Sequence, residues 1–255
     1  MMTFRALESE FPTDRAPLLR WLIFTGICAF GFVLVWHYGL FRLMLASDKT
    51  RLSLIITALY GLTTLHCLWR THAISKEIDA TQRLKAIIER SSGRFTVAGA
   101  NVLTEDGTRL PQGRVTEHIR NLVLKAGLQG RHRLDQTLLL RGLADSLRGP
   151  NQLGSFASDS LMKLGLLGTI IGFIMMLAPI AGLDAGDKAA MKTSMGVMSD
   201  GMAVAMYTTL TGLIGSILIK IQYYMLDDAT ARLFAMATDV TEVFVVSVLE
   251  RGQDG

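Results

Sequence analysis

Four long apolar segments, separated by polar stretches, dominate the pattern of this 255-residue sequence. A helix needs about 20 residues to cross the hydrocarbon core of a bilayer. We therefore expect an all-α membrane protein with four transmembrane helices. The predicted spans are Trp21–Phe41, Leu52–Trp69, Leu164–Leu183 and Gly201–Ile219.

The long polar stretch between the second and third spans has helical spacing of its apolar residues. Its first such run continues directly from the second span, so we expect one long helix that leaves the membrane. Glycine, proline and an Asp-Gly turn then interrupt the pattern between residues 93 and 113, which is typical of a short hairpin. Two further helices are predicted, the first marked by Val115, Ile119 and Leu122, the second by Leu134, Leu138 and Leu147.

Charge predicts the orientation of these segments. Residues 71–160 hold 13 lysines and arginines against nine acidic residues, whereas residues 184–200 hold two lysines against three aspartates. Because lysine and arginine are retained on the cytoplasmic side, the long loop should be cytoplasmic and the short loop external. Both chain termini are then cytoplasmic. The expected organisation is a cytoplasmic N-terminus (1–20), a transmembrane hairpin (21–70), a cytoplasmic helical domain (71–160), a pore-forming transmembrane pair (161–226) and a cytoplasmic C-terminal helix (227–255).

Composition limits the chemistry that the chain can perform. Half of the residues are hydrophobic and 19% are charged, fewer charges than soluble domains usually carry. We find no paired carboxylates within the spans, no metal-ligand spacing and no nucleophile–base pair, so we do not expect an enzyme, a metal site or another cofactor. The mixed charges of the long loop do not favour nucleic-acid binding. We interpret His66, in the second span, as an interfacial or packing residue.

Glycines and hydroxyls recur on the last two predicted spans. Gly168 and Gly172 form one step of small residues, a pattern that allows membrane helices to approach closely. Thr209 and Ser216 are seven residues apart and share one helix face, which Thr208 flanks. These residues are compatible either with packing notches alone or with the lining of a hydrated path, because hydroxyls donate and accept hydrogen bonds. The apolar runs that define these two spans contain no Asp, Glu, Lys or Arg, so a proton carrier would have to come from another chain.

Two motifs in this region carry a family resemblance. The stretches LGLLGTIIGFI and GMAVAMYTTLTGLIGSI, in this order within residues 161–220, resemble the signature of the MotA/TolQ/ExbB proton-channel family. The resemblance implies that Thr169 and Thr209 are pore threonines. Val204 stands where the family has a glutamate, and Met162 where it often has a proline. The four-span plan is nearer to MotA, whereas the motifs are nearer to TolQ and ExbB.

The pattern and the resemblance together give two groups of candidate residues. The expected ion-pathway residues are Thr169, Thr209, Ser216 and Thr208. The expected helix-packing or subunit-interface residues are Gly165, Gly168, Gly172, Gly201 and Gly212.

The resemblance also implies an assembly and an activity. Family members form a homo-oligomer, a pentamer, around two copies of a single-span partner similar to MotB, TolR or ExbD. The aspartate of that partner takes up a proton, and ion flow across the bacterial inner membrane becomes mechanical work. The transported ion would be H⁺, with Na⁺ as the alternative. A cytoplasmic partner at residues 71–160 is compatible with this plan. The rival function is a non-conducting membrane scaffold that docks a cytoplasmic protein through the same loop.

Overall fold

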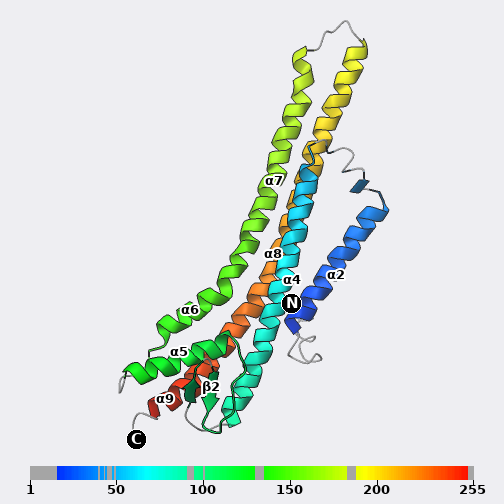
Figure 1. The fold of residues 1–255 in the computed structure, drawn as a ribbon. Coiled ribbons are helices and arrows are strands. Elements are labelled where there is room, and N and C mark those ends of the chain that lie inside the picture. Colours follow the sequence, from blue (N-terminus) through cyan, green and yellow to red (C-terminus); the bar gives the residue numbers. More distant parts are fainter. Residues whose placement is uncertain are drawn as a thin grey trace, which may run out of the picture. The chain divides into compact units, whose positions relative to one another are not determined.

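Helices make up nearly all of the described structure, which is a computed structural model (Figure 1). The structure describes residues 16–39, 41–42, 44, 48, 50–90, 95–99, 101–129, 135–182 and 188–251. The main helices are α2 (Ala16–His37), α4 (Leu52–Arg90), α5 (Arg114–Gln129), α6 (Thr137–Arg148), α7 (Gln152–Leu177) and α8 (Lys188–Val240). The short elements are strands β1 (Phe95–Ala98) and β2 (Asn101–Thr104), 3-10 turns η1 (Gly149–Asn151) and η2 (Ala178–Gly182), the π-helix η3 (Thr241–Val246) and α9 (Ser247–Arg251).

The predicted fold class is confirmed, because the described residues contain four helical segments that are long and apolar enough to cross a membrane. They correspond to the four predicted spans, although each helical segment differs from the prediction in length. The protein is an all-α, multi-pass membrane protein with a mostly helical segment between its second and third spans.

The helices continue well past the apolar runs. Helix α4 extends 39 residues from Leu52 to Arg90, so the second span does continue as one long helix, as predicted. Helix α8 is longer still, with 53 residues. Its start at Lys188 corrects the predicted 184–200 loop, because residues 188–200 contain good helix formers and no proline. The predicted tail helix is the continuation of α8, followed by η3 and α9.

The chain divides into two compact units. The first contains Trp69–Asn151 and Met225–Gly255, and the second contains Trp21–Leu68 and Gln152–Tyr224. Helices α4 and α8 each contribute residues to both units.

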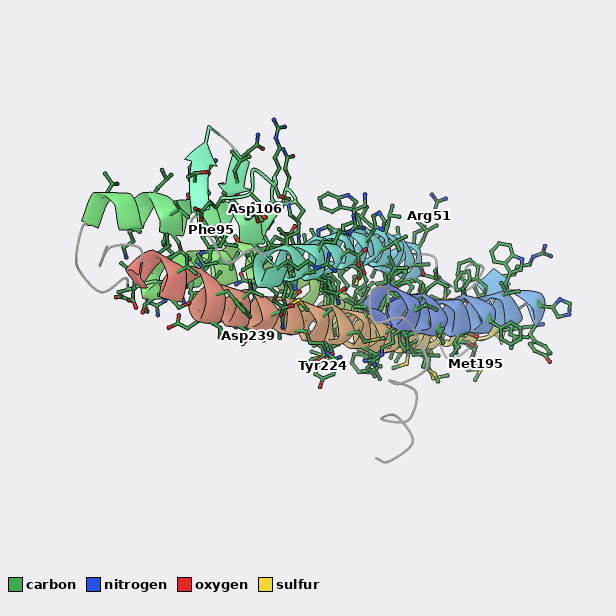
Figure 2. All side chains as sticks on the ribbon, turned by 90° about the horizontal axis from the view of Figure 1, so that it is seen from below. Arg51, Phe95, Asp106, Met195, Tyr224 and Asp239 are labelled. Atoms are coloured by element: carbon green, nitrogen blue, oxygen red, sulfur yellow. The ribbon has the colours of Figure 1, made fainter. Side chains whose placement is uncertain are left out.

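The first unit has an ordinary apolar core. Leu84, Ile119 and Val240 are almost completely buried in it. The predicted hairpin is present: β1 and β2 pair antiparallel, with Phe95 opposite Thr104, and Gly99 at the turn has a φ of +63°. Phe95, labelled in Figure 2, belongs to the same core. The two further helices are α5 and α6, although Leu134 lies outside the described residues.

The second unit contains a hairpin made by α2 and α4. Asp48 precedes α4 and accepts hydrogen bonds from the backbone N–H groups of Thr50 (3.0 Å) and Ser53 (2.7 Å). Burial alone would raise the pKa of Asp48, but these bonds and those from the neighbouring hydroxyls outweigh it, so the pKa is lowered. The indole N–H of Trp21 donates to Cys67 Sγ at 3.2 Å and joins the two helices.

Candidate ion-conducting site

Helices α7 and α8 meet through glycine, and Figure 1 shows them running side by side. A Cβ atom on Gly172 would lie 2.5 Å from the carbonyl oxygen of Gly201, and one on Gly212 would lie 2.8 Å from the Cα of Gly165. Side chains do not fit at such distances, so each of these glycines is required for the close approach of the two backbones. The sequence predicts that these glycines serve either helix packing or the subunit interface. In the structure their close contacts join two helices of one chain.

Thr208 occupies the remaining notch in this contact. A Cβ atom on Gly168 would lie 2.1 Å from Thr208 Oγ1, so the threonine side chain fills the space that the glycine leaves. Thr208 has no exposed surface, and its hydroxyl donates to the carbonyl of Val204 at 2.8 Å. A threonine hydroxyl inside a membrane helix usually makes such a hydrogen bond to the carbonyl four residues earlier. Thr208 thus acts as a packing residue in this chain.

Ser216 is also enclosed. Its hydroxyl lies 3.0 Å from that of Ser158 on α7, and Ser158 is within 3.0 Å of the Ser216 carbonyl oxygen as well. Both serines are buried, with exposed fractions of 8% for Ser216 and 2% for Ser158. The pair adds a polar contact between α7 and α8, and it leaves Ser216 little surface for a lumen shared with other chains.

Thr169 and Thr209 differ from the other two hydroxyl residues, because both are only half-buried. Thr209 donates to the carbonyl oxygens of Ala205 (2.9 Å) and Gly165 (3.3 Å), and Thr169 donates to that of Leu166 (2.5 Å). A hydroxyl oxygen that donates one hydrogen bond retains acceptor capacity. These two side chains therefore combine partial exposure with a hydroxyl oxygen that can accept a bond.

A comparison with protein families decides what this region is. Residues 116–238 match the sequence model described as the MotA/TolQ/ExbB proton channel family, and this segment covers most of α5, all of α6 and α7, and nearly all of α8. This segment of the chain, residues 116–238, belongs to the MotA/TolQ/ExbB proton channel family. No curated protein and no solved structure matches the chain.

The segment that matches the MotA/TolQ/ExbB family contains the whole α7–α8 contact but neither α2 nor any part of α4. Val204 lies inside it and is fully buried. A valine here provides no carboxylate, so this chain does not place an acidic side chain at the position where the family resemblance leads one to look for a glutamate.

A polar contact between α4 and α8 was missed from the sequence. His66 Nδ1 lies 2.7 Å from the hydroxyl of Tyr223, with the two rings nearly parallel. The Tyr223 ring lies directly over Gly154 of α7, where a Cβ would come within 2.1 Å of it. Tyr223 follows Ser216 by seven residues, so it shares the helix face of Thr209 and Ser216, but this spacing does not identify its partner on α4. His66, which the sequence predicts to be an interfacial or packing residue, thus has a specific polar partner on α8.

Proposed function

We propose that this chain is the channel subunit of a proton-driven motor in the bacterial inner membrane. It works with a single-span partner whose aspartate carries the proton, and the assembly converts ion flow into mechanical work. Membership of residues 116–238 in a proton channel family and four membrane-spanning helices support this proposal. A unit charge that crosses the membrane gains about 2.3 kcal/mol per 100 mV, which is the energy available for the work.

The observation that carries the proposal is the contrast among the four candidate hydroxyls. Thr208 and Ser216 are enclosed by the α7–α8 contact, whereas Thr169 and Thr209 keep exposed surface. We assign these two threonines to the ion pathway, where they contact the carboxyl group of the partner. Neutral hydroxyls suit this task, because they hydrogen-bond both the protonated and the ionised carboxyl group.

The assembly follows from the same assignment. The described spans leave large apolar side chains exposed, among them Ile170 and Phe173 of α7 and Leu210 and Ile214 of α8. We propose that the chain forms a homo-oligomer, a pentamer, in which these apolar side chains face lipid or a neighbouring copy. The two threonines then face a shared lumen that holds two copies of the partner. Both chain termini and residues 71–160 are cytoplasmic in this arrangement, and that segment is available to a cytoplasmic protein.

Replacing both threonines with valine tests the assignment. Valine keeps the shape of threonine but removes the hydroxyl, so we expect proton flux through the complex purified with its native partners to fall at least about tenfold. The matched control is Thr57→Val on α4, where the hydroxyl donates to the Ser53 carbonyl at 2.8 Å in the same manner.

The outcomes separate the alternatives. Unchanged flux in the double variant, with assembly intact by size-exclusion chromatography, would reject the assignment. Flux that requires sodium and is insensitive to the proton gradient would identify a sodium-driven member of the family. Absence of any ion flux through the wild-type complex would favour the non-conducting scaffold.

A further inference from the structure

The contact between His66 and Tyr223 has properties that helix packing alone does not require. Of the two histidines in the predicted spans, His37 is exposed at the end of α2, whereas His66 lies between helices. Histidine is the side chain whose charge ordinarily changes between pH 5 and 8. The partner of His66 is a hydroxyl, which can donate to a neutral imidazole and can accept from a protonated one.

The Tyr223 side chain joins three helices through this contact. It belongs to α8, its hydroxyl reaches α4 at His66, and its ring fills the space above Gly154 of α7. The neighbouring Tyr224 is 75% exposed and projects away from α8 in Figure 2. The two adjacent tyrosines therefore differ in position, and only Tyr223 is placed to transmit a change at His66 to all three helices.

A second observation concerns a buried polar side chain next to this contact. The side chain of Gln222, adjacent to Tyr223, is completely buried. Its amide interacts with the Tyr60 hydroxyl, but neither amide atom makes a hydrogen bond of good geometry within the described residues. A buried amide without well-formed hydrogen bonds is unfavourable, so the helix contact next to Tyr223 contains a polar group that packing alone does not satisfy.

We propose that His66 and Tyr223 form a proton-binding site that couples protonation to the packing of α4, α7 and α8. In the neutral state the Tyr223 hydroxyl donates to the Nδ1 lone pair of His66. A proton that arrives from water binds to Nδ1, the Nδ1–H group then donates to the Tyr223 oxygen, and the phenolic hydrogen turns to another acceptor. Release of the proton to water reverses these steps. The importance of this site for conduction rests on the proposed function, whereas proton binding itself does not.

Several charged groups lie near this site along the chain. On α4, Arg70 follows one turn later, and its guanidinium donates to the Leu147 carbonyl at 2.9 Å. On α8, Lys220 precedes Tyr223 by three residues and is exposed. On α7, Asp159 follows Gly154 by five residues and is also exposed. Asp227, four residues after Tyr223, accepts a hydrogen bond from Asn151 at 2.8 Å. Asp159, Lys220 and Asp227 are exposed, so water and salt screen their charges, whereas Arg70 is buried. The Tyr223 hydroxyl, which contacts the ring directly, and the Arg70 guanidinium are therefore the groups expected to influence His66.

Nuclear magnetic resonance of the full chain in lipid nanodiscs, with ¹⁵N-labelled histidine, tests the proposal. We expect one imidazole signal that His66→Gln removes and that changes with pH between 4 and 9. Tyr223→Phe deletes the hydroxyl and should move the midpoint of that change by at least about 0.5 pH unit. The matched controls are His72→Gln, at an exposed position on the same helix, and Tyr224→Phe. Both should leave the His66 titration in place.

The thermal midpoint provides the readout for coupling. In the wild type and in His72→Gln, it should change with pH over the interval in which His66 titrates, and in His66→Gln this change should disappear. A His66 signal that stays constant from pH 4 to pH 9 would overturn the proposal. So would a titration midpoint of His66 that Tyr223→Phe leaves unchanged. Neither measurement needs the partner or ion flux. Failure here is therefore distinguishable from failure of the proposed function, which the threonine variants test.

Discussion

The α7–α8 contact and the core of the first unit are packed in opposite ways. In the contact, glycines such as Gly172 and Gly212 allow one backbone to touch the other. In the core, side chains such as Leu84 and Ile119 fill the interior. Burial of apolar side chains from water stabilises the core, but lipid provides no such driving force between membrane helices, which rely on close contact instead. Helix α8 contributes to both regions, so its buried residues change from small ones in the membrane contact to large ones in the core of the first unit.

The largest effect should come from breaking the backbone contact. Gly172→Leu places a side chain where a Cβ alone would meet the Gly201 carbonyl at 2.5 Å, so α7 and α8 must separate. We expect loss of folded protein in detergent, measured as the monodisperse fraction in size-exclusion chromatography. Gly61→Leu on α4 is the control, because nothing lies within 4 Å of its Cβ position. A Gly172→Leu protein with the yield and thermal midpoint of the wild type would show that the contact is dispensable.

A core truncation in the first unit should have a smaller, graded effect. Ile119 is fully buried, so Ile119→Ala removes buried methyl groups and leaves a cavity, at a cost of about 2–5 kcal/mol in the free energy of unfolding. Leu128→Ala on the same helix is the control, since Leu128 is 88% exposed and its loss should change that free energy by less than about 0.5 kcal/mol. Denaturant unfolding followed by circular dichroism measures both variants. Equal effects would contradict the assigned core.

The smallest effect concerns His118, a buried residue of α5. Burial lowers the pKa of His118 from its ordinary value of 6.5, and the side-chain hydrogen bond with Gln136 offsets only part of this decrease. The unfolded chain therefore takes up the proton at a higher pH than the folded chain. The contribution of neutral His118 to the free energy of unfolding should be fully present above about pH 6.5 and should decrease as the pH falls below that value. Thermal unfolding between pH 5 and 8 measures this dependence, which His118→Gln should reduce and which His72→Gln, at an exposed position, should not. An unchanged slope in His118→Gln would assign the dependence to other groups.

The sequence predicted the membrane helices well because their length and apolarity are local properties of each segment. It missed the early start of α8, since residues 188–200 are too polar to resemble a span although they are helical. The seven-residue spacing of Thr209 and Ser216 identified a helix face but not what the face contacts. Glycines and hydroxyls serve a lumen and a neighbouring helix equally well, so the burial of Thr208 could only be seen in three dimensions. The pairing of His66 with Tyr223, 157 residues away, has no local signal at all.

The turn before α4 has a consequence for biosynthesis. The Asp48 carboxylate accepts its hydrogen bonds from residues at most five positions later, and the Trp21–Cys67 contact joins α2 to α4 without any group from α7 or α8. The first two spans can therefore insert and pair while the ribosome is still synthesising the rest of the chain. The hairpin would then already be in the bilayer when the glycine-bearing helices emerge and find each other.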